Sequence, residues 1–363
     1  MPGPLRVAAF VSPHGFGHAA RSAAILAALA ALRPGIEIEI RTSVPRWFFE
    51  ESLGFPFRYQ ELVCDVGLVQ RSPVAEDLPA TVAALERFWE GEEARVARLA
   101  AELAAAGVGL VLCDIAPLGL VAARRAGIPS VLVENFTWDW IFGPLVAEEP
   151  GLAPWIPFLR ERFALADRHL QLEPACSRAE GSIAIGPVSR SPRCDPAGVR
   201  ARLDVPDGRA LVLVSLGGIE HRVEALAPLI ERREAVFVLP GASDREETSD
   251  NLRLLPHHSP VHHPDLVAAA DVVVGKLGYS TVAEAIAAGT RMLYVPRPGF
   301  RESAVLERFV VSRLPSASIA WNELESGTWV SQLAPLLSIP RPQPAPAPGA
   351  AMAARELLSI LPS

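Results

Sequence analysis

The stretch ADVVVGKLGYSTVAEAIAAG, residues 270–289, decides the fold expected for this chain. It starts with a β-branched apolar run, continues through a turn that contains Gly275 and Gly278, and ends in an alanine-rich segment. An apolar run of this kind is typical of a buried parallel strand, and glycines let the backbone turn sharply and approach a ligand closely. The stretch therefore predicts a strand, a tight turn and a helix.

The start of this helix carries the residues that suggest a ligand. Thr281 and Glu284 have capping-box spacing, and Gly289 provides the stop. Lys276 lies in the turn and is the only lysine in the chain, so we expect its ammonium to be needed there as a compact charge. The helix N-terminus offers free N–H groups and a positive dipole end, which favour a phosphate. The alternative is that Glu284 only caps its helix and Lys276 only extends to solvent.

Length and composition favour a two-domain globular protein. The chain has 363 residues, of which 50% are hydrophobic and 21% charged. A formal net charge of −7 gives no basic surface for nucleic acid, so small molecules are the expected partners. No apolar stretch reaches the roughly 20 residues of a membrane span, and the first apolar run is too short for a signal peptide. We therefore expect a cytoplasmic protein without a transmembrane segment.

The cysteines agree with a reducing compartment. They are widely spaced and form no CxxC pair, which favours free thiols over disulfides. The four are Cys64, Cys113, Cys176 and Cys194.

Strands and helices alternate through the first half of the chain, which predicts a parallel, doubly wound α/β domain at 1–170. The predicted strands are 6–12, 37–43, 57–64, 108–114 and 129–134, and the predicted helices are 18–33, 45–53, 81–106 and 118–126. Ligands of such sheets bind outside the carboxyl ends of the strands. That rule places His14, His18, Asp114 and the loop 135–140 on one rim.

A second alternating set at 199–338 predicts a second domain of the same kind. Residues 171–198 are expected to form a linker, and 339–363 a Pro/Ala-rich tether that leads to a final helix. Gly217 and Gly218 follow a predicted strand at 210–215 and are separated from it only by Leu216, so their backbone N–H groups could supply a second phosphate contact.

The first glycine turn, HGFGH at 14–18, does not fit a nicotinamide site. It lacks the GxGxxG pattern, and Arg41 and Thr42 stand where an acidic ribose ligand is expected. His14 and His18 flank the turn. A helix N-terminus lowers the pKa of a histidine and leaves a neutral imidazole, which is what a general base for an alcohol needs. The alternative is that these histidines brace the loop.

Two other segments have both a binding and a structural interpretation. In NFTWDWIF, Asn135, Trp138 and Asp139 could hold a carbohydrate or nucleoside or could be ordinary core. In HHSPVHH, residues 257–263, the histidines are adjacent pairs rather than i, i+4 pairs. This spacing favours a loop beside a nucleotide base over a metal site, so we assign no metal ligand.

Together these motifs resemble the GT-B glycosyltransferases of the UDP-glycosyltransferase superfamily, which include the peptidoglycan N-acetylglucosaminyltransferase. They resemble most closely the glycosyltransferase-like N-terminal region of plant L-arabinokinases. The resemblance rests on HGFGHAAR at 14–21, NFTWDWIF at 135–142, GKLGYSTVAEAIAAG at 275–289 and VPRPGFRES at 295–303. It implies two Rossmann-like domains facing across a cleft, with the acceptor side in the N-terminal domain and a nucleotide-sugar donor, by default a UDP sugar, in the C-terminal domain.

The resemblance also implies residue roles. Glu284 would bind the donor ribose, and Glu302 would bind the donor sugar, although FRES replaces the usual DQ or QQ pair and leaves the sugar open. The implied donor side is Gly217, Gly218, Lys276, Gly278, Ser280, Thr281, Glu284, Arg301 and Glu302. The implied acceptor side is His14, Gly15, Gly17, Asn135, Trp138 and Asp139, and the catalytic pair is His18 and Asp114.

The implied reaction is a hexosyltransferase-type displacement with inversion, in which His18 takes the acceptor proton. The helix dipole, the glycine N–H groups and Lys276 would stabilise the leaving diphosphate without a cofactor or a metal. Two alternatives stay open: a nucleotide-sugar 2-epimerase, which needs no acceptor, and a non-catalytic nucleotide-sugar binding module. The chain shows no phosphate loop of the small-molecule kinases. The acceptor is unassigned, and the aromatic residues 47–49 fit either a membrane-facing patch or core.

Overall fold

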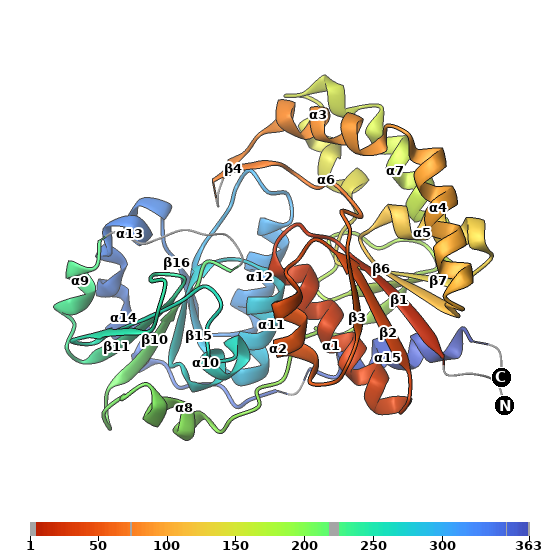
Figure 1. Cartoon of the computed structure of the whole chain (residues 1–363). Coiled ribbons are helices and arrows are strands. Elements are labelled where there is room, and N and C mark those ends of the chain that lie inside the picture. The colour runs from red at the N-terminus through yellow and green to blue at the C-terminus, as the bar shows by residue number, and fades with distance from the viewer. Residues whose placement is uncertain (1–4, 73–74, 218–224, 346, 362–363) are drawn as a thin grey trace. The chain divides into compact units, whose positions relative to one another are not determined.

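The chain folds into two compact α/β units, each built on a seven-stranded sheet (Figure 1). The computed structural model describes residues 5–72, 75–217, 225–345 and 347–361. Unit 1 comprises Met1–Val188 and Pro348–Ser363, and unit 2 comprises Ser189–Ala347. The predicted fold class, an α/β protein with two mostly parallel sheets, is confirmed.

The sheet of unit 1 is parallel throughout. Its strands in spatial order are β3 (Arg58–Glu61), β2 (Glu37–Thr42), β1 (Arg6–Val11), β6 (Leu110–Asp114), β7 (Ser130–Glu134), β8 (Arg168–Leu172) and β9 (Ile183–Ile185). The order reverses between β1 and β6, and ligands of such sheets bind outside the carboxyl ends of the strands at that point. Asp114 is the last residue of β6, so it lies where a ligand is expected.

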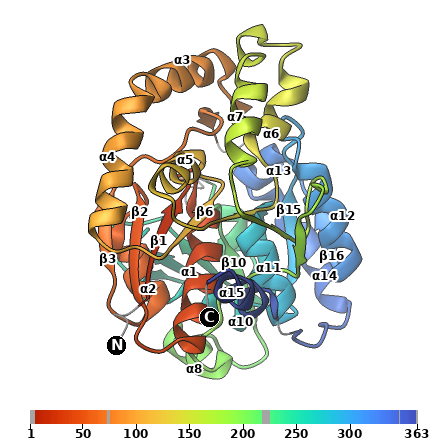
Figure 2. The same ribbon diagram turned by 90° about the vertical axis from the view of Figure 1, so that its right-hand side faces the viewer.

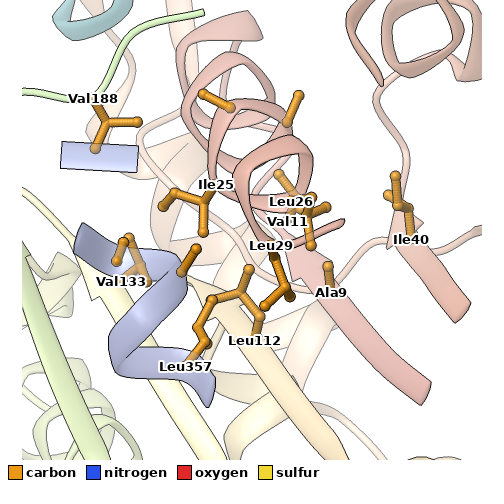
Figure 3. Packing of buried hydrophobic residues seen from close by; sticks show 14 of the residues in the cluster. Ala9, Val11, Ile25, Leu26, Leu29, Ile40, Leu112, Val133, Val188 and Leu357 are labelled. Atoms are coloured by element: carbon orange, nitrogen blue, oxygen red, sulfur yellow. The ribbon is translucent and has the colours of Figure 1, made fainter. Parts of the chain in front are cut away.

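Helices cover both faces of this sheet because both faces are apolar. On one face, α1 and α15 bury Ile25, Leu26, Leu29 and Leu357 over the strands (Figure 3). On the other face, α5 lies against β6 and is joined by α4 and α7 (Figure 2). The helices of unit 1 are α1 (Phe16–Leu32), α2 (Arg46–Leu53), α3 (Leu78–Trp89), α4 (Glu92–Ala105), α5 (Pro117–Ala126), α6 (Trp138–Leu145), η1 (Pro150–Leu152), α7 (Trp155–Phe163) and α15 (Gly349–Ser359), and a small hairpin joins β4 (Gln70–Ser72) to β5 (Ala75–Glu76).

Helix α15 belongs to unit 1, although the whole of unit 2 precedes it in the chain. In Figure 1 this blue helix lies beside the red helix α1, and Ala353, Ala354 and Leu357 are buried in the same core as the face of α1. Strand β9, which lies within the expected linker at 171–198, is also part of unit 1.

The sheet of unit 2 repeats this plan, with one antiparallel edge strand. Its strands in spatial order are β12 (Glu247–Ser249), β13 (Leu252–Leu255), β11 (Ala235–Pro240), β10 (Ala210–Val214), β14 (Val272–Lys276), β15 (Arg291–Val295) and β16 (Ser316–Ser318). Its helices are α8 (Pro196–Arg202), α9 (Ala227–Ile230), α10 (His263–Ala269), α11 (Tyr279–Ala288), α12 (Ser303–Arg313), α13 (Trp321–Ser326), η2 (Thr328–Gln332) and α14 (Leu333–Ser338). Here the strand order reverses between β10 and β14, which places Lys276 at the switch.

The structure corrects two local predictions. The single helix expected over 81–106 is two helices, because Gly91 adopts a left-handed conformation (φ 66°) between α3 and α4. The capping box expected at Thr281 and Glu284 is absent, because α11 already begins at Tyr279 after Gly278. Glu284 therefore lies inside the helix, where its carboxylate is available to other partners.

The aromatic residues Phe48 and Phe49 are buried in the core of unit 1, so they do not form a membrane-facing patch. Within the described part of the chain, none of the helices has the length and apolar character that crossing a membrane requires. All four cysteines are free thiols, as expected.

The close docking of α15 yields a stability prediction. A Cβ at Gly349 would overlap the carbonyl oxygens of Gly186 and Pro187, so we expect Gly349→Ala to push the helix outward and destabilise unit 1 by about 1–3 kcal/mol. The matched control is Gly198→Ala in α8, where an added Cβ meets nothing within 4 Å. Urea unfolding should show the loss only for Gly349→Ala, and equal stabilities of the two variants would contradict this account of the docking.

Candidate functional site

Unit 1 gathers a group of polar side chains at the carboxyl ends of β1 and β6. Gly15, with φ 87°, allows the chain to turn from β1 into α1. His18 and Arg21 are then three residues apart on α1 and lie on the same face of the helix. In the sheet, Asp114 is paired with Val11, so the first turn of α1 lies over its carboxylate.

Asp114 is the centre of this group and accepts hydrogen bonds from three side chains of α1. Its Oδ1 lies 2.8 Å from His18 Nδ1, and its Oδ2 accepts from Arg21 Nε at 2.7 Å and from Ser22 Oγ at 2.8 Å. Arg21 also donates to Asn135, whose amide in turn donates to the backbone at 2.8 Å. These side chains are all buried, so the network is shielded from water.

Asp114 and Arg21 both contact His18 Nδ1. Burial alone would raise the pKa of Asp114, but the charge and hydrogen bonds of Arg21, together with His18, lower it to about 2. The carboxylate therefore holds no proton and can only accept in its 2.8 Å contact with His18 Nδ1, whereas the guanidinium of Arg21, whose Nη2 lies 2.9 Å from the same nitrogen, can only donate. The tautomer that pairs with Asp114 carries its hydrogen on Nδ1 and leaves a lone pair on Nε2, which is the arrangement a general base requires.

His18 is also kept neutral. Burial lowers its pKa, the charge of Arg21 lowers it further, and Asp114 opposes both. The helix N-terminus was the expected cause of a lowered pKa of His18, whereas burial and Arg21 are the causes in the structure. Arg21 was missed as a site residue; its position one helical turn after His18 is the signal that could have identified it.

Trp138, which was expected on the acceptor side, packs against His14 beside this group. Trp138 is 1% exposed, its Nε1 donates to Asp65 Oδ2 at 2.8 Å, and the ring of His14 packs edge-on against it at 5.0 Å. A ring so completely packed offers no face for a ligand to stack on. Asn135 is equally buried, whereas Asp139 forms an ion pair with Arg160 at 3.2 Å.

Asp65 is a second buried carboxyl group that sequence reasoning missed. Burial raises its pKa to about 7, although hydrogen bonds from Trp138 and Ser12 act in the opposite direction. A Cβ at Gly67 would overlap both Trp138 and His14, so the segment after β3 fits closely around these rings. Gly17 lies in the first turn of α1.

Unit 2 forms its own polar group at the carboxyl ends of β10 and β14. These ends approach so closely that a Cβ at Gly275 would overlap the carbonyl oxygen of Ser215. Gly217 has φ 73°, and the Lys276 side chain passes 3.6 Å from the position of a Cβ there. The turn residue Gly218 lies outside the described residues. Gly278 caps α11, and Ser280 lies in its first turn.

Lys276 is the last residue of β14 and carries a perturbed ammonium. Burial and then the charge of Arg297 lower its pKa to about 7, and Glu302 opposes the shift. Arg297 donates to Glu302 at 3.0 Å, and both of these side chains are buried. Arg301 is exposed. Unit 2 thus brings two cations and one carboxylate together beside the glycine turn.

Glu284 is buried and already has two charged or polar partners. Its Oε1 accepts from Arg190 Nε at 3.0 Å, and its Oε2 lies 2.8 Å from His263 Nδ1. Burial would raise its pKa, but Arg190 and His263 lower it to about 2. Sequence reasoning did not identify either partner, because Arg190 lies in the expected linker and His263 at the end of a histidine-rich loop.

The histidine-rich loop does not assemble a metal site. Among the residues that the structure describes, no three histidine, cysteine, aspartate or glutamate side chains come together as metal ligands. His263 instead joins Glu284 to Ser215, whose Oγ lies 3.0 Å from His263 Nε2.

The chain has the GT-B fold that its motifs suggested. It is similar over 99% of its length to the glycotransferase of kitacinnamycin (TM-score 0.66, 18% identity, 100% of that chain covered). It is also similar to the spinosyn forosaminyltransferase SpnP (TM-score 0.62, 18% identity, 99% and 96% covered). A third similar structure is Phytolacca americana UGT2 complexed with UDP-2-fluoro-glucose and pterostilbene (TM-score 0.62, 15% identity, 98% and 94% covered).

Two curated proteins are similar in sequence. The L-arabinokinase of Arabidopsis thaliana is 26% identical over 356 residues, which are 96% of this chain and 34% of that protein. The chain therefore spans about a third of the length of that relative. An uncharacterized glycosyltransferase of Methanopyrus kandleri is 25% identical over 305 residues, with 79% and 82% covered. No family model matches the chain.

The cation in the unit 1 network yields a prediction about His18. Removing the charge of Arg21 with Arg21→Gln should raise the pKa of His18, because a like charge that opposes the imidazolium is gone. The control is Ser22→Ala, which removes a neutral donor to the same carboxylate and should leave the pKa of His18 unchanged. Titration of labelled histidines by NMR measures both, and an equal shift in the two variants would show that the hydrogen bond rather than the charge matters.

Proposed function

We propose that the protein is a glycosyltransferase that moves a sugar from a nucleoside-diphosphate donor, with uridine as the first choice of nucleoside, to an acceptor hydroxyl. The observation that carries the proposal is the buried His18–Asp114 pair, in which the imidazole is neutral and, in the tautomer that donates to Asp114, has its lone pair on Nε2. The fold supports it, because the similar structures named above are glycosyltransferases.

The proposed base is His18. Its Nε2 takes the proton of the acceptor hydroxyl while that oxygen attacks the anomeric carbon, and the bond from this carbon to the diphosphate oxygen breaks. Attack opposite the leaving group inverts the configuration. Asp114 then stabilises the imidazolium through the Nδ1 hydrogen bond, as the carboxylate of a catalytic triad does. The nearby charge of Arg21 limits this stabilisation, so His18 is a weak base that stays unprotonated at neutral pH.

The proposed leaving-group site is in unit 2. Lys276, the N-terminus of α11 and the glycine turn at Gly217 would meet the negative charge that develops on the diphosphate. These groups supply the charge compensation themselves, so the proposed mechanism does not require a metal. UGT2 of Phytolacca americana, a similar structure, was solved with UDP-2-fluoro-glucose, which supports a UDP sugar as the donor class.

Glu284 is the proposed ribose ligand. Each of its carboxylate oxygens accepts one hydrogen bond from Arg190 or His263 and keeps a second lone pair to which a ribose hydroxyl can donate. Arg190 and His263 therefore fix the orientation of the carboxylate. Glu302, whose carboxylate accepts a hydrogen bond from Arg297, is the proposed contact to the sugar itself. Experiment has to identify which sugar the donor carries.

The lone lysine makes the donor site directly testable. Pyridoxal phosphate carries an aldehyde close to a phosphate group and condenses with an unprotonated amine, and the pKa of about 7 makes Lys276 reactive near neutral pH. We expect borohydride-trapped label at Lys276 and protection by UDP, both read by mass spectrometry. Lys276→Arg should lose the label. It should keep the rise in thermal stability that UDP gives to the wild type, because arginine also binds phosphate.

The outcome of that experiment separates nucleotides as well. Label elsewhere in the chain, or at Lys276 without protection by UDP, would contradict the assigned donor site. If ADP, GDP or TDP protected Lys276 from the label more strongly than UDP does, the nucleoside of that nucleotide would replace uridine in the proposed donor.

The assigned base predicts the effect of removing His18. With UDP-glucose or UDP-N-acetylglucosamine and a panel of small-molecule alcohols and sugars, we expect UDP release that depends on the acceptor and falls about 100-fold or more in His18→Ala. The control is His169→Ala, because His169 lies on β8 and contacts Glu134 rather than Asp114. Conversion of UDP-N-acetylglucosamine without any acceptor would identify a 2-epimerase instead, and unchanged turnover in His18→Ala would exclude it as the base.

A further inference from the structure

Unit 1 contains a second buried aspartate, Asp65, that the proposed function does not use. It lies in the segment between β3 and β4 and is 2% exposed. Its Oδ2 accepts a hydrogen bond from Trp138 Nε1 at 2.8 Å, and the Ser12 hydroxyl also donates to its carboxyl group. Its Oδ1 is buried and has no hydrogen-bond partner among the residues that the structure describes. The carboxyl group of Asp65 is therefore only partly satisfied.

The surroundings of Asp65 favour a neutral acid, whereas those of Asp114 favour a carboxylate. Arg21, the cation of this region, bonds to both oxygens of Asp114. The two described donors to Asp65 are an indole and a hydroxyl, which are both neutral. Asp114 is itself ionised and acts on Asp65 as a like charge. A buried charge with an unpartnered oxygen is far less favourable than a buried neutral acid, so the geometry keeps a proton on Asp65.

The other titratable groups on the elements around Asp65 stay neutral or contact different side chains. The thiols of Cys64 and Cys113 are neutral near pH 7, because burial raises their pKa. The groups that contact different side chains are His14 at Trp138 and Gln70, His18 and Arg21 at Asp114, and Asp139 at Arg160. Asp114 is thus the charge that acts on Asp65, and it opposes ionisation.

Both partners of Asp65 contact the turn that leads from β1 into α1. Ser12 follows β1 directly, and its hydroxyl oxygen accepts from the backbone N–H of His14 at 3.3 Å. Trp138 packs edge-on against the ring of His14, with 5.0 Å between the ring centroids. His18 lies in the first turn of α1, immediately after this segment. A change at Asp65 therefore reaches the turn through two contacts.

We propose that Asp65 is a positioning residue that holds the turn 13–17, and through it His18, only while its carboxyl group keeps a proton. When the O–H bond of Asp65 breaks, the proton passes to solvent and a carboxylate is left beside Asp114. The surrounding segments then loosen and admit water to solvate the new charge. The hold on the turn is a property of unit 1 alone, whereas its effect on catalysis rests on His18 as the base of the proposed function.

The direction of the pH dependence follows from the pKa of Asp65, which burial raises to about 7. The proton is bound on the acid side of pH 7 and lost on the alkaline side, so the turn is held below pH 7 and released above it. Amide hydrogen exchange of residues 13–18, read by mass spectrometry, measures the release. The wild type and Asp65→Asn should exchange equally at pH 6, and the wild type should exchange several-fold faster at pH 8. Asparagine cannot ionise, and its amide oxygen still accepts from Trp138.

The matched control is Asp77→Asn. Asp77 lies in the same connection between β3 and α3, and its carboxylate caps α3 by accepting from the backbone N–H of Ala80 at 3.0 Å. Asparagine is an equally good N-cap, so the helix is kept. This variant should exchange like the wild type at both pH values.

Two further measurements follow the proton and its effect on catalysis. The indole N–H resonance of Trp138, identified by its loss in Trp138→Phe, should titrate with a midpoint near pH 7 in the wild type and not in Asp65→Asn. Above pH 7, acceptor-dependent UDP release by the wild type should fall by up to about tenfold more per pH unit than release by Asp65→Asn. Deprotonation of Lys276 affects both proteins equally, so the difference between them reports on Asp65.

The possible results separate this inference from the proposed function. An indole resonance that does not titrate near pH 7, or that still does so in Asp65→Asn, would overturn the assignment of the proton. Equal exchange of residues 13–18 in the two proteins at pH 8 would overturn the hold on the turn. If the wild type released no UDP with any acceptor, the proposed function would fail, and the exchange and indole data would still decide about Asp65.

A second variant covers the case in which Asp65→Asn does not fold. The wild-type indole titration then decides about the proton. Ser12→Ala, which removes the hydroxyl between Asp65 and His14, decides about the link to the turn. Its residues 13–18 should exchange faster than those of the wild type at pH 6, and equal rates would overturn the link.

Discussion

A buried carboxylate that must remain ionised organises the polar residues of each unit. Taking such a charge out of water is unfavourable unless hydrogen bonds and an opposite charge replace the solvent. Asp114 obtains them from Arg21 and His18, and Glu284 obtains them from Arg190 and His263. In both units an arginine Nε and a histidine Nδ1 meet the same carboxylate. In each unit the arginine keeps the acid ionised, and the acid can only accept in its contact with the histidine.

How much the sequence reveals depends on whether a feature is local or long-range. The strand, turn and helix over 270–289 follow from apolar β-branched residues and glycine positions that act within the segment, and Asp114 could be placed because parallel strands end on one rim. The partners of the carboxylates could not be predicted, because they come from distant parts of the chain. Arg190, for example, lies 94 residues from Glu284. The sequence also could not exclude the capping box at Thr281 and Glu284. The first residue of α11 depends on where β14 ends, and the structure places it at Tyr279.

The aromatic segment after β7 shows why residue type alone does not identify a binding face. Tryptophan is common both in carbohydrate sites and in cores, and only its packing separates the two. In this structure Asp65 takes the indole N–H, and His14 and Gly67 close over the ring. Trp138 thus packs against the turn that carries the two histidines. Asp65, which no pattern in the sequence distinguished, is the residue that anchors it.

The return of α15 to unit 1 has a consequence for biogenesis. A ribosome releases the strands and helices of unit 1 first, then all of unit 2, and only afterwards the segment that covers the exposed side of α1. Throughout that interval the side of α1 that packs against α15 lacks the helix that covers it in the finished molecule. Nascent chains with uncovered apolar surface are prone to aggregate and to be held by chaperones. The order of synthesis therefore exposes unit 1 to aggregation until α15 has been made and has docked.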